Sequence, residues 1–497
     1  MLIDYVLTVA VSIAAGVAAV TSAFPQWHVN RVEMTIGFVL ILMIGNLRGI
    51  RESGRIFAVP TYFFIVTTLL LIGIGAWRAL TGTVYPVVSV NPVPTANQTL
   101  TLFLLLTAFS NGCTAMTGVE AVSNGVPAFR PPESRNAAAT MLMMAVLSIT
   151  MFLGITLLAQ SYHIIPSETE TVVSQLARGV FGSRGAAYYA VQAATMLILV
   201  LAANTAYADF PRLASILAHD RYLPRQFMNQ GDRLAFSNGI VGLSVFAGIL
   251  LVVFGGDTHA LIPLYMIGVF VSFTLSQAGM VVRWRRLRTP GWRRNAVING
   301  IGAVVTGLVL VVVAMTKAYE GAWIIILLIP VHVFLFRATR EHYDGVASQL
   351  SLRGWRPHGS RRNTVIVPIS GIQRAVVEAL DYAKTLSPDT RAVYVNIDPV
   401  ETERVKAQWS EWGAGVPLVV LESPYRSLME PLLDYIEHIN DAGGADGGDY
   451  VTVVLPEFVP ARWWHHLFHN QRALLIKGAL LFKRNTVVTS VPFHLKH

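Results

Sequence analysis

Long runs of apolar residues, separated by short polar loops, fill this chain up to about residue 339. All but the second run approach the ~20 residues that a helix needs to cross a bilayer. Charged residues make up only 13% of the chain, far below the ~25% of a soluble domain. The pattern therefore predicts an all-α polytopic membrane domain with about ten helices. The predicted spans are Leu2–Phe24, Met34–Leu47, Ala58–Leu80, Thr99–Val122, Asn136–His163, Ala186–Tyr207, Gly239–Gly255, Thr258–Trp284, Ala296–Lys317 and Gly321–Thr339.

The arginines of the predicted loops fall mostly on one side of the membrane. The even-numbered loops hold arginines within residues 48–55, 130–135, 212–233 and 283–294. The odd-numbered loops contain far fewer cationic residues, namely Arg31, Arg78, Arg178, Arg184 and Lys317. Since short cytoplasmic loops carry the excess of Lys and Arg, we expect the even loops and both chain ends to be cytoplasmic. This placement of the net charge of +9 indicates a lipid bilayer as the partner, and not nucleic acid.

The composition changes after Arg340. A basic linker at residues 341–363 precedes short β-branched runs that alternate with helical stretches. Such alternation is typical of βαβ units with a mostly parallel sheet. We therefore expect a transmembrane transport domain over residues 1–340 and a cytoplasmic α/β regulatory domain over residues 364–497. Strands are predicted at Thr364–Ile369, Arg391–Ile397, Leu418–Glu422, Tyr450–Leu455 and Thr486–Val491, and helices at Ile372–Leu386, Glu401–Trp412, Tyr425–Asn440 and Arg462–Phe482.

The first predicted span carries a polar stripe made of Asp4, Tyr5, Thr8 and Ser12. The last three follow the spacing of one helix face. Ionisable and hydroxyl groups are costly in hydrocarbon and usually mark a pathway. Their oxygen atoms suit a hard cation or a polar solute. Two simpler interpretations remain: a stripe that only packs helices together, and a solvated Asp4 at the start of its helix.

The fourth predicted span combines glycines with polar residues between Ser110 and Glu120. Two glycines, Gly112 and Gly118, at membrane depth indicate an unwound helix, and such breaks form the binding sites of many secondary transporters. Because desolvation favours a protonated carboxyl group, Glu120 is a candidate for the coupled proton. The alternative places Glu120 at the cytoplasmic interface.

The remaining candidates give weaker signals. Tyr265 follows Pro263 in the eighth span, where its hydroxyl group could face a cavity or its ring could pack. In the tail, the Ser370-Gly371 turn could hold a phosphate at a helix N-terminus, but a Gly-rich phosphate loop is missing. We therefore expect no enzyme activity, no cofactor and no metal beyond a transported ion.

Several of these segments resemble a known family. The stretches Asp4–Ser12, Gly112–Asn124, Leu201–Thr205 and Ile262–Tyr265 look like the KimA branch of the KUP-type potassium importers. In the tail, Pro424–Leu428 and His469–Gln471 resemble the same branch, so the resemblance covers essentially the whole chain.

The resemblance implies proton-coupled potassium uptake into bacteria across the inner (plasma) membrane. It implies the amino acid–polyamine–organocation superfamily with a LeuT-like inverted repeat. The tail would resemble a universal stress protein domain, dimerise and take part in inhibition by cyclic di-AMP. Carried onto this sequence, the cation-site oxygens fall on Asp4, Tyr5, Thr8, Ser12 and Thr117, the proton-linked carboxylate on Glu120 and a gating aromatic on Tyr265.

For the nucleotide, three arginines near the predicted junction of the two domains are candidates because guanidinium groups pair bidentately with phosphates. They are Arg337, Arg340 and Arg353.

The sequence departs from the family at its start. Members of the family have two further helices before the position of Asp4, so about ten of an expected twelve are present. We therefore expect the upstream reading frame to encode additional residues, and the present chain to be unstable alone.

Two other functions compete with potassium import. An amino-acid permease of the same fold would bind the substrate carboxylate with the amide groups of unwound helices. A membrane sensor that does not transport would read a nucleotide through its tail. Glu120 and the hydroxyl stripe favour a cation over an amino acid.

Overall fold

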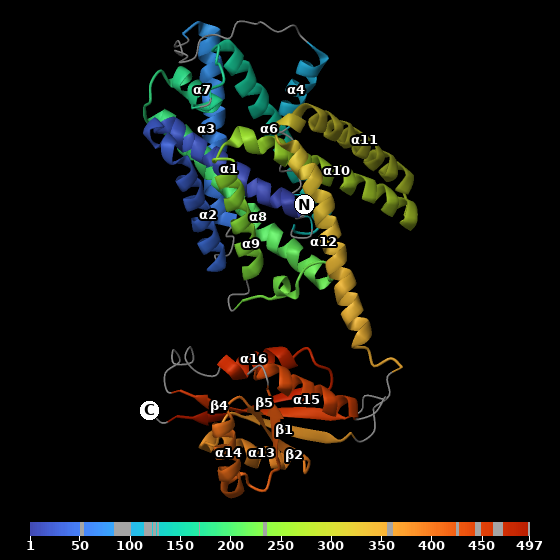
Figure 1. Cartoon of the computed structure of the whole chain (residues 1–497). Helices are drawn as coiled ribbons and strands as arrows, with labels where there is room; N and C mark the ends of the chain where they lie inside the picture. The colour runs from blue at the N-terminus through green and yellow to red at the C-terminus, as the bar shows by residue number, and fades with distance from the viewer. Residues whose placement is uncertain are drawn as a thin grey trace. The chain divides into compact units, whose positions relative to one another are not determined.

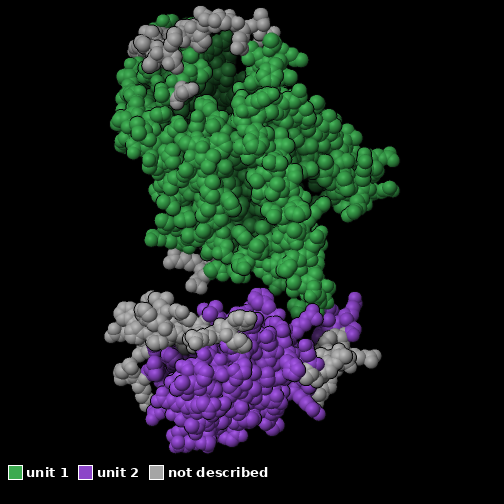
Figure 2. Space-filling model, in the orientation of Figure 1, with its two compact units in different colours: residues 1–350 green, residues 351–497 purple. Residues whose placement is uncertain are grey.

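The chain forms two compact units, residues 1–350 and residues 351–497, coloured separately in Figure 2. The computed structural model describes residues 1–49, 54–83, 101–113, 122, 126, 129–167, 169–231, 236–354, 361–423, 427–442, 449–460 and 471–495. The division at residue 350 lies beyond the boundary predicted at residue 340. Helix α12 runs from Ala322 to Gln349, so the first part of the predicted linker continues this helix.

The first unit is helical throughout the residues that the structure describes (Figure 1). Its elements are α1 (Leu2–Ala23), η1 (Pro25–Asn30), α2 (Arg31–Leu47), α3 (Gly54–Thr81), α4 (Leu102–Cys113), α6 (Glu133–Ser161), α7 (Val172–Phe181), α8 (Ala186–His219), η4 (Arg225–Met228), α9 (Ser237–Val253), α10 (Thr258–Leu287), α11 (Trp292–Lys317), η5 (Ala318–Glu320) and α12 (Ala322–Gln349).

Within the described residues, 8 helices are long and apolar enough to cross a membrane. Two shorter apolar helices, Leu102–Cys113 and Ser237–Val253, coincide with the fourth and seventh predicted spans. A polytopic helical membrane domain is thereby confirmed.

Helix α1 is the centre of this unit. It ends where Pro25 forbids a helical conformation for the preceding residue. In its most apolar window 72% of the residues are buried, compared with 6% for α6. One cluster of buried residues joins α1 to α2, α8 and α9, and a second joins it to α10 and α11. Because other helices surround α1 on most sides, most of its side chains are shielded from lipid.

Helix α6 shows the opposite pattern. Its residues Leu142, Val146, Ile149 and Leu153 follow one helix face and are all more than half exposed. In water a stripe of this kind would be an interaction surface. In a membrane protein it is the face that contacts lipid tails.

Small residues set the spacing between α3 and α6. A Cβ atom at Gly75 would lie 2.8 Å from Leu158, and one at Gly154 would lie 2.8 Å from Ile72. Each glycine therefore receives a branched side chain of the other helix, a packing mode that is common in membranes. The hydroxyl group of Tyr162 also donates to the Gly75 carbonyl oxygen over 3.1 Å.

The second unit is an α/β domain with a five-stranded parallel sheet in the order β3-β2-β1-β4-β5. Alternate residues of β1 point to opposite faces, so Val365 and Val367 pack against α13, whereas Ile366 packs in the cluster of α15 and α16. The elements are β1 (Asn363–Ile369), α13 (Arg374–Leu386), β2 (Thr390–Asn396), α14 (Pro399–Trp412), β3 (Leu418–Glu422), α15 (Met429–Ala442), β4 (Tyr450–Val459), α16 (Gln471–Leu480) and β5 (Thr486–His494). The predicted mostly parallel sheet with helices between its strands is confirmed.

An ion pair at the N-terminal end of β2 is connected to β1 by a hydrogen bond. Arg391 donates to both oxygens of Asp389, over 2.9 and 3.1 Å, and the Thr364 hydroxyl group donates to Oδ2 over 2.9 Å. Partial burial raises the pKa of the Asp389 carboxyl group, but these hydrogen bonds outweigh it and hold that pKa below its usual value. The carboxylate therefore stabilises the fold above its unfolded pKa, and this contribution is lost as the pH falls through the folded pKa.

The contact of α8 with α9 provides a test of the fold. A Cβ atom at Gly239 would lie 2.8 Å from the Cα atom of Pro211, whose backbone cannot move aside. We expect Gly239→Ala to destabilise the membrane unit by ~1–3 kcal/mol, as overpacking does elsewhere. The matched control is Gly37→Ala, because a Cβ atom there has nothing within 4 Å. Thermal unfolding of the purified protein in detergent should show a lower melting temperature for the first variant only, and equal melting temperatures would contradict the α8–α9 contact.

Candidate functional site

The polar stripe of α1 lies inside the membrane unit. Asp4 is 3% exposed, and Thr8 and Ser12 are half-buried one and two turns further along the same helix. The Thr8 hydroxyl group donates to the Asp4 carbonyl oxygen over 2.9 Å. Its one proton is thereby committed to the backbone, so the lone pairs of Thr8 Oγ1 are available to accept a ligand. The stripe presents oxygen atoms at a depth where they are otherwise costly.

Asp4 faces helix α10. Its Cα, Cβ and Oδ1 atoms each lie 3.8 Å from the position that a Cβ atom of Gly268 would occupy. Tyr265 precedes Gly268 by three residues and therefore lies on the same face of α10. The Tyr265 side chain is 6% exposed and packs in the cluster that contains Leu7 of α1. The structure thus brings Asp4, Thr8 and Tyr265 to one interface between α1 and α10.

Tyr5 has a different environment. It is 7% exposed and belongs to the cluster that also holds Ala206 and Tyr207 of α8. Its ring is therefore part of the packing between α1 and α8. A role for Tyr5 as a cation ligand stays a prediction.

Two predicted site residues, Thr117 and Glu120, lie outside the described residues. Helix α4 leads to them and is described as far as Cys113, which is 6% exposed. Cys113 packs in the same cluster as Leu7 and Tyr265. Helix α4 therefore reaches the α1–α10 interface, while the unwound segment and the position of the Glu120 carboxyl group remain predictions.

A second polar group, which the sequence analysis did not assign, joins α2 to α8. The Asn46 side chain donates to Asn204 Oδ1 over 2.8 Å and to the Leu42 carbonyl oxygen over 2.9 Å. An asparagine near the end of an apolar run is the available signal, because its amide group needs a partner within the bilayer.

Tyr207 makes a similar contact between α8 and α9. Its hydroxyl group lies 2.9 Å from Ser244 Oγ and donates to the Val39 carbonyl oxygen over 3.4 Å. These contacts connect α8 to α2 and α9.

The three arginines proposed for a nucleotide are in different environments. Arg340 hydrogen-bonds to Tyr222, lies over its ring at 4.8 Å and pairs with Asp344 at 3.6 Å. Asp344 also pairs with Arg221 at 2.7 Å, so Arg340 already belongs to a network that ties α12 to the end of α8. Arg337 is exposed on α12, and Arg353 is exposed in the second unit. Their joint action on one nucleotide stays a prediction.

Comparisons with known proteins agree with this architecture. A family model described as an amino acid permease matches residues 1–335, and one described as the KimA potassium transporter C-terminal domain matches residues 361–493. The potassium transporter KimA of Bacillus subtilis (strain 168) is 44% identical over 496 residues, which is 100% of this chain and 81% of the relative. The chain therefore belongs to the amino acid permease family of membrane transporters and, within it, to the group that includes the potassium transporter KimA.

Proposed function

We propose that this protein imports potassium ions by secondary active transport coupled to protons. The observation that carries the proposal is its identity of 44% with a potassium transporter along the whole chain. The match of the tail to the C-terminal domain of that transporter adds a second, independent region of similarity. Both bear on potassium, whereas proton coupling is inferred from the carboxyl groups of the sequence.

The α1–α10 interface has the chemistry that a potassium site needs. A dehydrated monovalent cation requires several oxygen ligands, and hydroxyl and carboxylate groups provide them. Asp4 supplies negative charge in a buried position, and Thr8 supplies lone pairs. Tyr265 lies on the face of α10 that Asp4 contacts and would close the site from that side. Ser12 continues the stripe by one turn.

Glu120 is our candidate for the coupled proton. A lone carboxyl group in an apolar span favours the protonated form, so Glu120 can carry a proton while potassium occupies the neighbouring site. Cotransport then requires that the conformational change occur only when both ligands are bound or both are absent. The amino-acid permease remains the second candidate because the family model of residues 1–335 carries that description.

The tail is proposed to regulate transport from the cytoplasm. The strand order β3-β2-β1-β4-β5 changes direction between β1 and β4. Open α/β sheets bind ligands in the crevice outside the carboxyl ends of the strands at such a switch point. The Ser370-Gly371 turn follows β1 at this place. We propose that the domain resembles universal stress proteins and dimerises. We further propose that it binds cyclic di-AMP at this switch point and does not hydrolyse it.

Replacing Asp4 tests the cation site. Because Asp4→Asn removes the buried negative charge, we expect the half-saturating concentration for rubidium uptake to rise at least about tenfold, the change that corresponds to ~1.4 kcal/mol. Thr8→Val should act in the same direction, since it removes the oxygen ligand and keeps the shape. The control is Thr150→Val, because the Thr150 hydroxyl group donates to the Val146 carbonyl oxygen of the same helix over 2.8 Å and lies on an exposed face.

These assays use proteoliposomes and radiotracer rubidium, with amino acids as competitors. Unchanged rubidium affinity in Asp4→Asn would exclude this site. Inhibition by an amino acid together with no rubidium uptake would favour the permease instead.

Glu120 is tested separately. Since the amide group of Glu120→Gln cannot bind and release a proton, we expect proton-driven uptake to be abolished at unchanged expression. Potassium-driven exchange without a proton gradient should persist, because that process needs no net proton transfer. Uptake by Glu120→Gln that follows the proton gradient as in the native protein would show that another group carries the proton.

A further inference from the structure

Unit 1 encloses a second polar site at the other end of α1. A cavity of about 280 Å³ lies there between the C-terminal half of α1 and three loops. These loops follow α1, α6 and α9, and all three fall on the side that the arginine distribution predicts to be external. On α1 the cavity is lined by Ala15, Ala19 and Ser22, which continue the face of Asp4, Thr8 and Ser12.

The cavity is suited to water. His28 Nδ1 and Thr258 Oγ1 both line it, and both are buried atoms without a hydrogen-bond partner among the described residues. Polar atoms of this kind are normally satisfied by ordered water. A protonatable side chain in the wall of this cavity can therefore exchange protons with the external solution.

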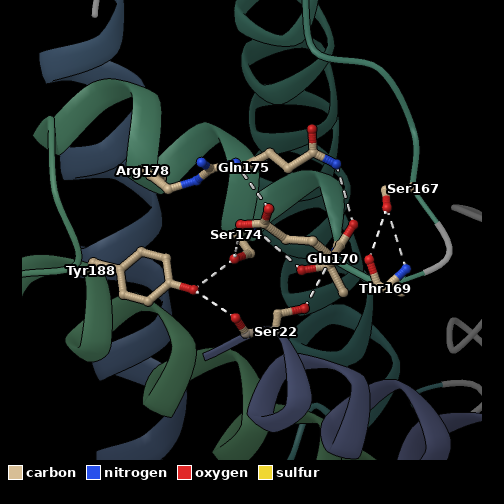
Figure 3. Close-up of polar contacts among 9 residues, drawn as sticks. Ser22, Ser167, Thr169, Glu170, Ser174, Gln175, Arg178 and Tyr188 are labelled. Carbon is tan, nitrogen blue, oxygen red and sulfur yellow. Dashed lines mark hydrogen bonds and ion pairs between the residues drawn. The ribbon is translucent and has the colours of Figure 1, made fainter. Parts of the chain in front are cut away.

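Glu170 is such a side chain, and Figure 3 shows the network around it. Its Oε2 atom accepts from Arg178 over 2.9 Å. Its Oε1 atom lies 2.8 Å from Ser174 Oγ, which lies 2.8 Å from the Tyr188 hydroxyl oxygen. The Tyr188 hydroxyl oxygen lies 3.1 Å from the Ser22 carbonyl oxygen of α1. Both Ser174 and Tyr188 are fully buried.

A count of protons distinguishes two states of this network. Three contacts run in series from Glu170 through Ser174 and Tyr188 to a carbonyl oxygen, which can only accept. Each hydroxyl group has one proton, so an ionised Glu170 leaves two protons for three contacts. A protonated Glu170 supplies the third, by donating to Ser174 Oγ while Ser174 donates to Tyr188 and Tyr188 to Ser22. The pair with Arg178 stabilises the ionised state instead.

We infer that Glu170 is an external proton-binding site, and that its protonation fastens the loop before α7 and helix α8 to the end of α1. A proton from external water binds Glu170 Oε1, and the two hydroxyl groups reorient to complete the three hydrogen bonds. The chain ends at a backbone carbonyl oxygen, so the proton is held there and not passed on. Release reverses these steps, with no other bond formed or broken.

This inference deepens the proposed function and rests on it, because a symporter must close its external side only after loading. A proton that completes a contact between α1, α7 and α8 stabilises the closed arrangement relative to the open one. A second contact across the same junction, from the Thr171 amide group to Ser22 Oγ over 3.0 Å, is independent of protonation. The contact of the loop before α7 and of α8 with the end of α1, which we call the latch, is therefore weakened but not abolished when Glu170 is ionised.

Other charged groups surround the network and contribute to the electrostatic potential at the Glu170 carboxyl group. Arg178 on α7 contacts it directly, and Arg184 lies over the Tyr188 ring at 5.9 Å. Among the described residues, the other titratable groups that line this cavity are His28 of η1, Arg31 of α2, Asp257 after α9 and His259 in the first turn of α10.

Infrared spectroscopy tests the proton site without relying on transport. We expect difference spectra of the reconstituted full chain to show carboxyl C=O bands as the external pH is lowered, and we expect Glu170→Gln to lack one of them. The glutamine keeps an N–H group for Ser174 and an oxygen for Arg178, so the melting temperature should be unchanged. The control Glu33→Gln removes an exposed carboxylate on the same predicted side and should keep the band that Glu170→Gln lacks. Spectra of Glu170→Gln that retain every carboxyl band of the native protein overturn the proposal.

Uptake measurements test the latch. In the native protein, rubidium uptake should be faster in an acidic external medium than in an alkaline one, so the ratio of the two rates should exceed unity. This ratio should fall toward unity in Glu170→Gln and in Ser174→Ala. It should not fall in the control Glu33→Gln. A native ratio in Glu170→Gln contradicts the latch. If the native chain takes up no rubidium at all, the proposed function is wrong, whereas the infrared band still decides whether Glu170 binds the proton.

Discussion

The structure of the membrane unit depends on how hydrocarbon treats polar groups. Hydroxyl and carboxyl groups that face lipid lose their hydrogen bonds to water, at a cost of several kcal/mol. Helix α1 carries Asp4, Thr8 and Ser12, so it must lie inside, and the helices with apolar faces must surround it. The burial of α1 and the exposed apolar stripe of α6 are two results of this one constraint. The surrounding helices can pack closely against one another and against α1 because glycines and alanines at their interfaces have small side chains.

Patterns that extend over a whole element could be predicted from the sequence. Apolar runs of the right length identify the membrane helices, and alternation of short strands with helices identifies the parallel sheet. The strand Leu418–Glu422 has the predicted bounds, whereas β4 extends to Val459 because its second half pairs with β5 beyond the predicted end. The continuation of α12 to Gln349 was not predicted, because a helix that leaves the bilayer loses its apolar signal there.

The candidate site could be predicted only in part, because side-chain partners depend on the packing of helices far apart in the sequence. The spacing of Tyr5, Thr8 and Ser12 predicts a helix face, but not the contact of the neighbouring Asp4 with Gly268. The hydrogen bond between Asn46 and Asn204 joins residues 158 positions apart, and no local pattern indicates it. The network of Glu170 was not predicted for the same reason, since Ser174 connects it to Tyr188 on α8 and, through Tyr188, to Ser22 on α1.

The two polar ends of α1 are connected by a stiff element. Asp4 and Ser22 are eighteen residues apart, which is ~27 Å of α-helix. In the part of α1 between them, Gly16 faces α8, since a Cβ atom at Gly16 would lie 3.6 Å from Leu199 Cβ, and α8 also carries Tyr188. A displacement of the Ser22 end of α1 is therefore transmitted to the polar stripe with little bending. In the proposed scheme, a proton bound at Glu170 and a cation bound at Asp4 both act on the position of this one helix against α8 and α10. Two ligands that bias the same rigid element are coupled reciprocally, without direct contact between their sites.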